Sequence, residues 1–222
     1  RLVWSERPPL AVEYGEYAFC ADGEKFCGDS SRFLYDERGR AHLLLSDGMG
    51  SGCNAALDSA MTAGLLERLI RAGFRFDSAI RLVNSALLLK SGDESLATAD
   101  SCELDLFCGR ADFCKAGAAP SYVLKHGRAV RVSAMSLPAG ILGGTAFEEE
   151  NLTLGPGDWI VMVSDGAIAE GDDWILKDMK TLPEKTAPEA ARYFAERAKA
   201  IRSDGHSDDI TVLAAKLVEN GA

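Results

Sequence analysis

The sequence lacks the patterns that mark zinc-stabilised, secreted and membrane-spanning proteins. Its six cysteines form no Cys-x-x-Cys pair and it has only three histidines, so the close-spaced ligands of a structural zinc site are missing. No apolar run is long enough for a transmembrane helix. No basic segment followed by an apolar stretch opens the chain, as it would in a signal peptide. These absences favour a reduced, cytoplasmic setting.

Positive charge is also in deficit. The 222 residues include 24 Lys and Arg against 34 Asp and Glu, which gives a formal net charge of −10. Such a balance argues against nonspecific binding to nucleic acid or to anionic lipid. Hydrophobic residues make up 47% and charged residues 26%, the composition of an ordinary globular protein. We therefore expect a folded protein without a nucleic-acid partner.

The ends of the sequence and two of its cysteines give further expectations. Residues 1–10 have the character of a linker or tail, and residues 11–220 are predicted to form one domain. Because Arg1 is not an initiator residue, we expect a piece of a longer protein. Cys102 and Cys108 share the alternation of the neighbouring leucines, which predicts small buried side chains on one face of a strand.

Hydrophobic periodicity predicts more strands than helices. Apolar residues at helical spacing predict helices over 54–72 and from an N-cap at Asp77 to about Gly92. A third helix is predicted from the capping box Thr186-x-x-Glu189 to Gly205. Strands are expected over 11–19, 33–35, 42–45, 101–107, 111–115, 122–124, 130–132, 147–154, 159–163 and 210–217. Tight turns join successive strands, so we predict an α+β fold of antiparallel sheets with helices packed outside.

A glycine-rich loop over 48–52 is similar to nucleotide-binding loops but departs from both common types. Cys53 stands where a dinucleotide fingerprint needs its third glycine, and no Lys-Ser/Thr pair follows as in a P-loop. Asp47, just before the loop, would repel a pyrophosphate by roughly 4 kcal/mol at about 4 Å in an effective dielectric of about 20. A carboxylate at this place is compatible with phosphate only if a cation lies between them.

Aspartates recur where buried strands are expected to end or begin. Asp47 and Asp165 each follow an apolar strand within Ser-Asp-Gly, Asp208 and Asp209 precede the last strand, and Asp29 lies within Gly-Asp-Ser. Each alone is more often a turn residue than a ligand. Together they form an oxygen donor set of the kind that Mg²⁺ and Mn²⁺ prefer, and unpaired carboxylates at buried strand ends would be costly. We therefore predict a two-metal hydrolytic centre at one edge of the sheets.

Five motifs in this order resemble the metal-dependent (PPM, type 2C-like) protein serine/threonine phosphatases. Within them the chain is most similar to the C-terminal phosphatase domains of the stage II sporulation protein E family. The motifs are Gly28-Asp29-Ser30, Ser46-Asp47-Gly48-Met49-Gly50-Ser51-Gly52, Leu137-Pro138-Ala139-Gly140-Ile141, Gly157-Asp158 with Ser164-Asp165-Gly166, and Asp208-Asp209-Ile210-Thr211.

The resemblance implies an α-β-β-α sandwich with a centre of two Mn²⁺ or Mg²⁺ ions between the sheets. It assigns the direct ligands to Asp47, the carbonyl oxygen of Gly48, Asp165 and Asp208, with Asp47 bridging both ions. It gives Asp209 a supporting role and lets Asp29 hold a metal through water. A metal-activated water would attack phosphoserine or phosphothreonine, so Ser46 and Ser164 are expected to support the turns rather than act as nucleophiles.

The resemblance also implies a substrate and a setting. The substrate would be a phosphorylated anti-anti-sigma factor in sporulation control, and an upstream region would anchor the longer protein in the membrane. Met49 stands where eukaryotic members carry a histidine, and residues 11–29 lack their phosphate-binding arginine. Two alternatives stay open: a catalytically impaired interaction module, and a two-metal phosphoesterase acting on a small molecule. A homodimer also stays open.

Overall fold

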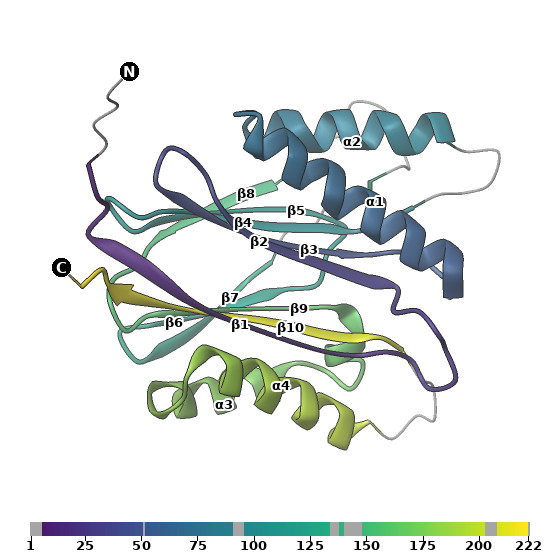
Figure 1. Ribbon diagram of the computed structural model, residues 1–222. Coiled ribbons are helices and arrows are strands. Elements are labelled where there is room, and N and C mark those ends of the chain that lie inside the picture. Colours follow the sequence, from purple (N-terminus) through teal and green to yellow (C-terminus); the bar gives the residue numbers. More distant parts are fainter. Residues whose placement is uncertain are drawn as a thin grey trace.

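Two five-stranded antiparallel sheets lie face to face between two layers of helices (Figure 1). The computed structural model describes residues 6–50, 52–90, 96–133, 138–139, 148–202 and 208–221. The strands are β1 (Leu10–Phe19), β2 (Asp29–Tyr35), β3 (Arg40–Asp47), β4 (Ala99–Asp105), β5 (Arg110–Ala116), β6 (Ser121–Lys125), β7 (Arg128–Val132), β8 (Glu148–Thr153), β9 (Trp159–Val163) and β10 (Ile210–Glu219). The helices are α1 (Gly52–Arg71), α2 (Phe76–Lys90), η1 (Asp165–Ile168), α3 (Asp173–Asp178), η2 (Met179–Glu184) and α4 (Ala187–Ile201). The predicted fold class is confirmed.

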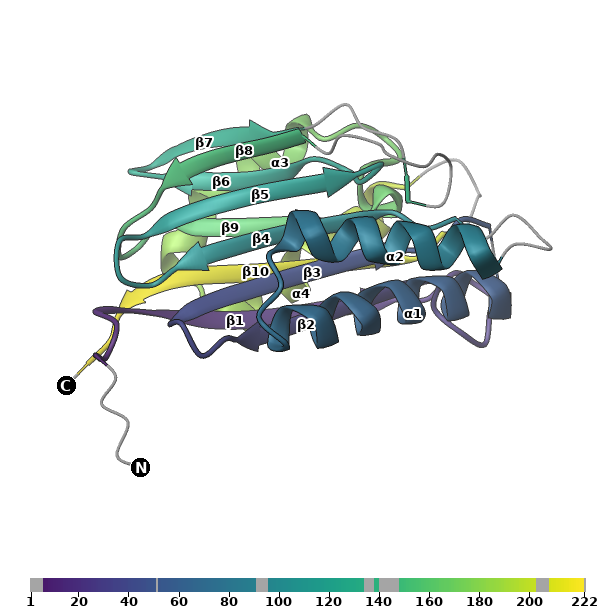
Figure 2. The same cartoon turned by 90° about the horizontal axis from the view of Figure 1, so that it is seen from above.

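The order of strands shows how distant segments meet. The first sheet has the order β1-β10-β9-β6-β7 and the second the order β2-β3-β4-β5-β8. Helices α1 and α2 cover the outer face of the second sheet (Figure 2), and α3 and α4 cover the outer face of the first (Figure 1). Among the described helices, none is long and apolar enough to cross a membrane.

Burial on both faces explains the continuous apolar runs of the central strands. On β3, Leu43 and Leu45 belong to the cluster between the two sheets, and Leu44 belongs to the cluster beneath α1 and α2. A strand that is covered on both sides has no polar face to alternate with. Helix α4 packs on the other sheet with Phe194 fully buried in a third cluster.

The start of α4 is built as its sequence predicts. The Thr186 side chain accepts a hydrogen bond from the Glu189 backbone, and the Glu189 carboxylate accepts one from the Thr186 backbone at 2.8 Å. Two backbone donors that no helical carbonyl can reach are thereby satisfied. The predicted capping box is confirmed, while the predicted end of this helix at Gly205 lies outside the described residues.

Two expectations about local structure were wrong, and one set of elements was not predicted. Asp77 is not an N-cap but lies in the first turn of α2, which begins at Phe76. Cys108 is exposed because β4 ends at Asp105, whose carboxylate accepts the N–H groups of Phe107 and Cys108 and so turns the chain. The short helices η1, α3 and η2 between β9 and α4 were not predicted at all.

We predict that Gly15→Ala and Gly64→Ala change stability in opposite directions. A Cβ at Gly15 would lie 2.3 Å from backbone atoms of Ala187, so β1 could no longer approach α4, at a cost of about 1–3 kcal/mol. A Cβ at Gly64, inside α1, meets nothing within 4 Å and should stabilise by about 0.5–1 kcal/mol. Urea unfolding midpoints measure both, and two shifts of the same sign would contradict the packing described here.

Candidate metal centre

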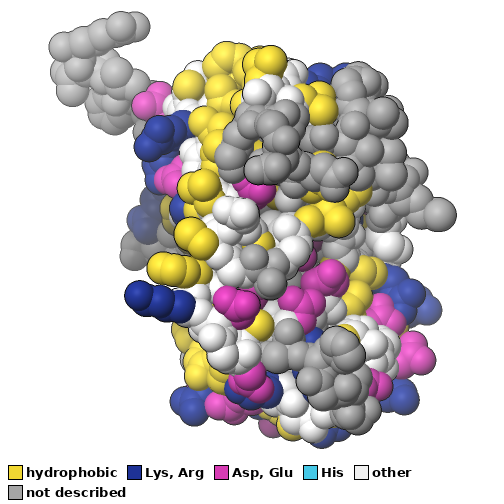
Figure 3. Space-filling model, turned by 90° about the vertical axis from the view of Figure 1, so that its right-hand side faces the viewer, with side chains coloured by type: hydrophobic (Ala, Val, Ile, Leu, Met, Phe, Trp, Pro, Cys, Tyr) yellow, Lys and Arg dark blue, Asp and Glu magenta, His cyan; other side chains and the backbone are white. Residues whose placement is uncertain are grey.

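The predicted aspartates gather at one end of the sandwich, where strands of both sheets begin or end. Asp29 begins β2 directly opposite Asp47, which ends β3. In the other sheet Asp165 follows the end of β9, beside the start of β10, because Val163 pairs with Val212. Figure 3, the view on to this end, shows Asp and Glu side chains gathered near the middle of the face.

Asp29 and Asp47 form a pair of like charges across β2 and β3. Residues directly opposite in an antiparallel pair have their Cβ atoms about 4.5–5.5 Å apart on the same face, and like charges there are destabilising. Asp29 is 9% exposed, and neither of its carboxylate oxygens has a hydrogen-bond partner among the described residues. Burial raises the pKa of Asp29 to about 7. Without a cation, this carboxylate is poorly accommodated.

Asp47 is held rigidly by its backbone. Its N–H donates to Thr98 Oγ1 at 2.9 Å, and its carbonyl oxygen accepts from the Thr98 N–H at 2.7 Å. The next residue, Gly48, donates to the Gly28 carbonyl at 3.1 Å, and a Cβ there would lie 2.0 Å from the carbonyl oxygen of Ala55 in α1. A glycine is required at this close approach, which places the Asp47–Gly48 backbone against the start of α1.

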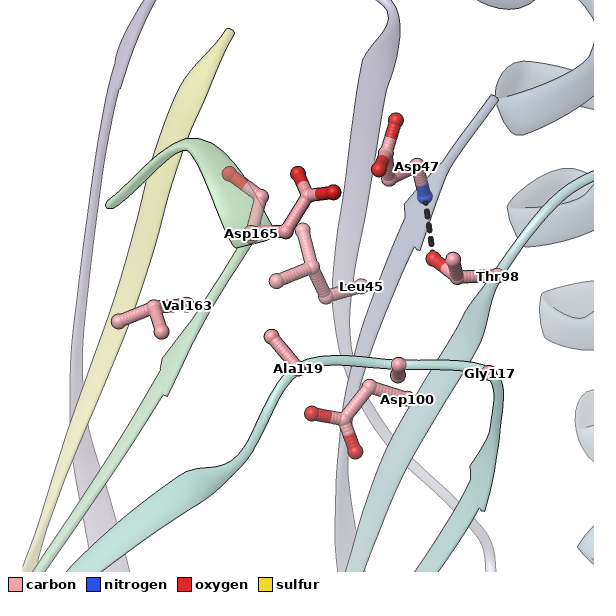
Figure 4. Close-up of a pocket in the computed structure, with 10 residues that line it drawn as sticks. Leu45, Asp47, Thr98, Asp100, Gly117, Ala119, Val163 and Asp165 are labelled. Carbon is pink, nitrogen blue, oxygen red and sulfur yellow. Dashed lines mark hydrogen bonds between the residues drawn. The ribbon is translucent and has the colours of Figure 1, made fainter. Parts of the chain in front are cut away.

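Asp165 approaches Asp47 from the opposite sheet. Figure 4 shows the two carboxylates pointing toward one another from the ends of β9 and β3, with Leu45 below them. Burial, and then the charges of Asp29 and Asp165, raise the pKa of Asp47 to about 8. Burial and the charge of Asp165 also raise the pKa of Asp208. The charge of Asp165 thus acts on both Asp47 and Asp208, and a cation among these carboxylates would relieve the repulsion.

A narrow cleft lies beneath these carboxylates. It leaves about 20 Å³ for the centre of a water molecule, which is room for roughly one water. Both sheets contribute to it. Its lining consists of Leu45, Asp47, Thr98, Asp100, Gly117, Ala118, Ala119, Val163, Ser164 and Asp165 (Figure 4).

Unlike Asp29, Asp209 has hydrogen-bond partners for both of its carboxylate oxygens. One of its carboxylate oxygens accepts the N–H of Ala21 at 2.8 Å and the other accepts the N–H of Gly28 at 2.6 Å. It therefore joins the start of β10 to both ends of the loop between β1 and β2, directly before Asp29. This geometry suits a supporting role, because the carboxylate fixes the loop that leads into the site.

The two serines of the Ser-Asp-Gly motifs bind backbone groups. Ser46 Oγ donates to the Thr98 carbonyl oxygen at 2.7 Å. Ser164 Oγ accepts the N–H of Thr211 at 2.9 Å and donates to the Asp209 carbonyl oxygen at 3.3 Å. In these hydrogen bonds both hydroxyls pair with backbone groups, and Ser164 also lies near enough to Asp29 to act on the pKa of that carboxyl. Their contacts tie the ends of β3 and β9 to neighbouring strands.

The carboxylate oxygens of the predicted ligands lie farther apart than the ligand atoms around a single bound ion. Within the part of the chain that the structure describes, one group of three His, Cys, Asp or Glu ligand atoms lies within 4.8 Å of one another, and it is Cys20, Cys27 and Asp209. The carboxylates that face each other across the cleft are not among them. A larger spread is compatible with more than one ion and with ligands that act through water.

Sequence reasoning missed a buried charged group under the cleft. Lys115 Nζ donates to Asp100 Oδ2 at 2.5 Å, to Ser121 Oγ at 2.7 Å and to the Ala119 carbonyl oxygen at 2.8 Å. Lys115 and Asp100 are each 1% exposed and pair directly across β4 and β5. An Asp in one apolar strand and a Lys in the next were the sequence features that could have predicted this buried ion pair. Through the Ala119 carbonyl oxygen, Lys115 fixes the segment between β5 and β6 that lines the cleft.

Comparisons with known proteins find relatives that share most of this sequence and its fold. Stage II sporulation protein E of Bacillus subtilis (strain 168) is 34% identical over 200 residues, and that of Priestia megaterium is 30% identical over 211 residues. These matches cover 87% and 91% of the chain but only 24% and 36% of the relatives. The solved PP2C phosphatase domain of SpoIIE from Bacillus subtilis, with a fragment of its regulatory domain, is 30% identical. It has a TM-score of 0.85, over 96% of this chain and 64% of that one.

The fold and the matched region define a PP2C-type phosphoprotein phosphatase domain. The family model of stage II sporulation protein E (SpoIIE) matches residues 37–218. The chain therefore belongs to the stage II sporulation protein E family, and the resemblance stated from the motifs is confirmed.

We predict that Asp209→Ala releases the loop between β1 and β2. The N–H groups of Ala21 and Gly28 lose their acceptor, so hydrogen exchange of residues 20–28 should accelerate and stability should fall by about 1–3 kcal/mol. Glu24→Gln, which removes a charge from the same loop, is the control and should leave the exchange unchanged. Equal exchange in the Asp209→Ala and native chains would contradict the role given to Asp209.

We predict that Lys115→Met destabilises the fold by about 3–5 kcal/mol, because Asp100 would stay buried without its cation. The matched control is Lys125→Met at the end of β6, which should change stability by less than about 0.5 kcal/mol. Chemical denaturation of both variants measures the difference. Similar midpoints would show that the buried group does not hold the turn beneath the cleft.

Proposed function

We propose that this chain hydrolyses phosphoserine or phosphothreonine in a protein substrate with two divalent cations, Mn²⁺ or Mg²⁺, at the acidic end of the sandwich. The observation that carries the proposal is the buried Asp29 carboxylate, which has no hydrogen-bond partner among the described residues and lies opposite Asp47. Membership of the SpoIIE family supports it. The metals and the substrate are part of the proposal.

The donor set fits hard divalent cations. Asp47, Asp165 and Asp208 would supply carboxylate oxygens, and Gly48 would supply its backbone carbonyl oxygen. These all-oxygen donors are typical of Mg²⁺ and Mn²⁺ rather than of thiophilic metals. The raised pKa values of Asp47 and Asp208 have burial and neighbouring carboxylates as their causes, and a bound cation would remove that repulsion.

Each residue then has a defined task. Asp47, the Gly48 carbonyl, Asp165 and Asp208 would hold the ions directly, Asp29 would act through water, and Asp209 would fix the loop before Asp29. Two bound cations would lower the pKa of a water molecule toward neutral pH and would offset the negative charge of the phosphoryl oxygens. Ser46 and Ser164 use their hydroxyls on backbone groups, so the proposal needs no serine nucleophile.

The substrate is proposed as a phosphorylated anti-anti-sigma factor. The support is membership of a sporulation family, together with an open and exposed site: Met49, beside the candidate ligands, is 52% exposed. A cleft with room for about one water cannot enclose a small substrate. A phosphorylated residue presented on a protein surface fits such a shallow site better than a free metabolite.

The experiment measures phosphate release at increasing Mn²⁺ and Mg²⁺. Substrates are a phosphorylated anti-anti-sigma factor and a small aryl phosphate, and the same titrations are followed by thermal unfolding. We predict metal-dependent release from the phosphoprotein, and stabilisation of about 2.7 kcal/mol at a metal concentration 100 times its Kd. Asp47→Asn and Asp165→Asn should each lose more than about 100-fold in activity, since even indirect partners of metal ligands cost about 10–100-fold.

Asp112→Asn on β5 removes the same charge away from the site and is the matched control, expected to retain native activity. Stabilisation by metal without phosphate release from any substrate would favour an impaired interaction module. Release confined to the aryl phosphate would favour a small-molecule phosphoesterase. Equal activity of Asp47→Asn and the native chain would contradict the assigned site.

A further inference from the structure

The loop between β1 and β2 brings together two cysteines that are seven residues apart. Cys20 follows the end of β1 and Cys27 stands two residues before β2. Their sulfur atoms and a carboxylate oxygen of Asp209 all lie within 4.8 Å of one another. Cys20 is exposed and Cys27 is partly exposed, so solvent can reach the group. The phosphatase reaction proposed above uses neither thiol.

The position of the carboxylate in this group is fixed before any ligand binds. Asp209 accepts the N–H of Ala21, next to Cys20, at 2.8 Å, and the N–H of Gly28, next to Cys27, at 2.6 Å. The same side chain thus holds both ends of the loop and keeps the two thiols close. Each carboxylate oxygen has a second lone pair left for a metal. The group is organised by hydrogen bonds that do not depend on the acids across the cleft.

We propose that Cys20, Cys27 and Asp209 form a separate binding site for a thiophilic divalent cation, of which Zn²⁺ is the best match. Two sulfur ligands and one carboxylate oxygen suit Zn²⁺, whereas Mg²⁺ and Mn²⁺ prefer oxygen alone. Tetrahedral Zn²⁺ with Zn–S distances of about 2.3 Å needs its sulfur atoms nearly 4 Å apart. The present separation of at most 4.8 Å is closed by small side-chain movements.

The surrounding charge favours a cation here. Asp29 and Asp209 both lie near enough to the Cys27 thiol to act on it through their charges. On binding, each thiol forms a sulfur–metal bond and releases its proton to solvent, so one Zn²⁺ displaces two protons. Three protein ligands leave one tetrahedral position for water. The ion would close the base of the loop and so restrict the segment that leads into Asp29.

Cobalt substitution tests the site, because Co²⁺ bound to thiolate gives a near-ultraviolet charge-transfer absorption that carboxylates do not give. The chain is kept with a non-thiol reductant, titrated with Co²⁺ and then with Zn²⁺ in competition with a chelator. We predict one thiolate-bound ion per chain. Cys20→Ser and Cys27→Ser should each abolish the absorption and weaken Zn²⁺ binding by more than about 10-fold.

Two controls separate this site from its surroundings. Cys108→Ser removes an exposed cysteine from the turn after β4 and should leave the absorption unchanged. Asp47→Asn damages the proposed phosphatase centre and should also leave it unchanged, so failure of that function and failure of this site are distinguishable. Absence of the absorption, its survival in both cysteine variants, or recovery of the two cysteines only as a disulfide under reductant would overturn the proposal.

Discussion

The constraint on which this structure depends is the crowding of carboxylates at one end of the sandwich. Asp29 and Asp47 are direct neighbours on paired strands, and Asp165 faces them from the other sheet (Figure 4). Burial, and then the charges of the neighbouring carboxylates, raise the pKa of Asp47 to about 8. Carboxylates crowded in this way destabilise the metal-free protein. Bound cations would remove the repulsion, and the free energy gained would strengthen cation binding.

The rest of the fold holds that end in place. The Thr98 backbone and hydroxyl fix Asp47, and Gly48 lets α1 approach it closely. Below, the buried Lys115–Asp100 pair anchors the turn that closes the cleft. Rigid supports matter because ligands that could move apart would relieve their repulsion without a metal. A site of this kind therefore needs more structure behind it than the ligands alone suggest.

Much of the fold could be predicted because it depends on local pattern. The antiparallel strands, the capping box of α4 and the Ser-Asp-Gly turns all follow from residues close in sequence, and the order of motifs indicated the family. What could not be predicted depends on contacts between distant segments. Three features require knowledge of where neighbouring strands end. They are the ion pair of Lys115 with Asp100, the hydrogen bonds between Asp209 and the loop after Cys20, and the exposure of Cys108.

The measurement that tests the central claim most directly is anomalous diffraction from crystals of this chain grown with Mn²⁺. The account predicts two peaks between the sheets, within coordination distance of the Asp47 and Asp165 carboxylates and the Gly48 carbonyl oxygen. It also predicts that Asp29 gains a water-mediated contact to one of them. Crystals saturated with Mn²⁺ that show no peak beside Asp47, with the Asp29 carboxylate still buried without a partner, would contradict the account.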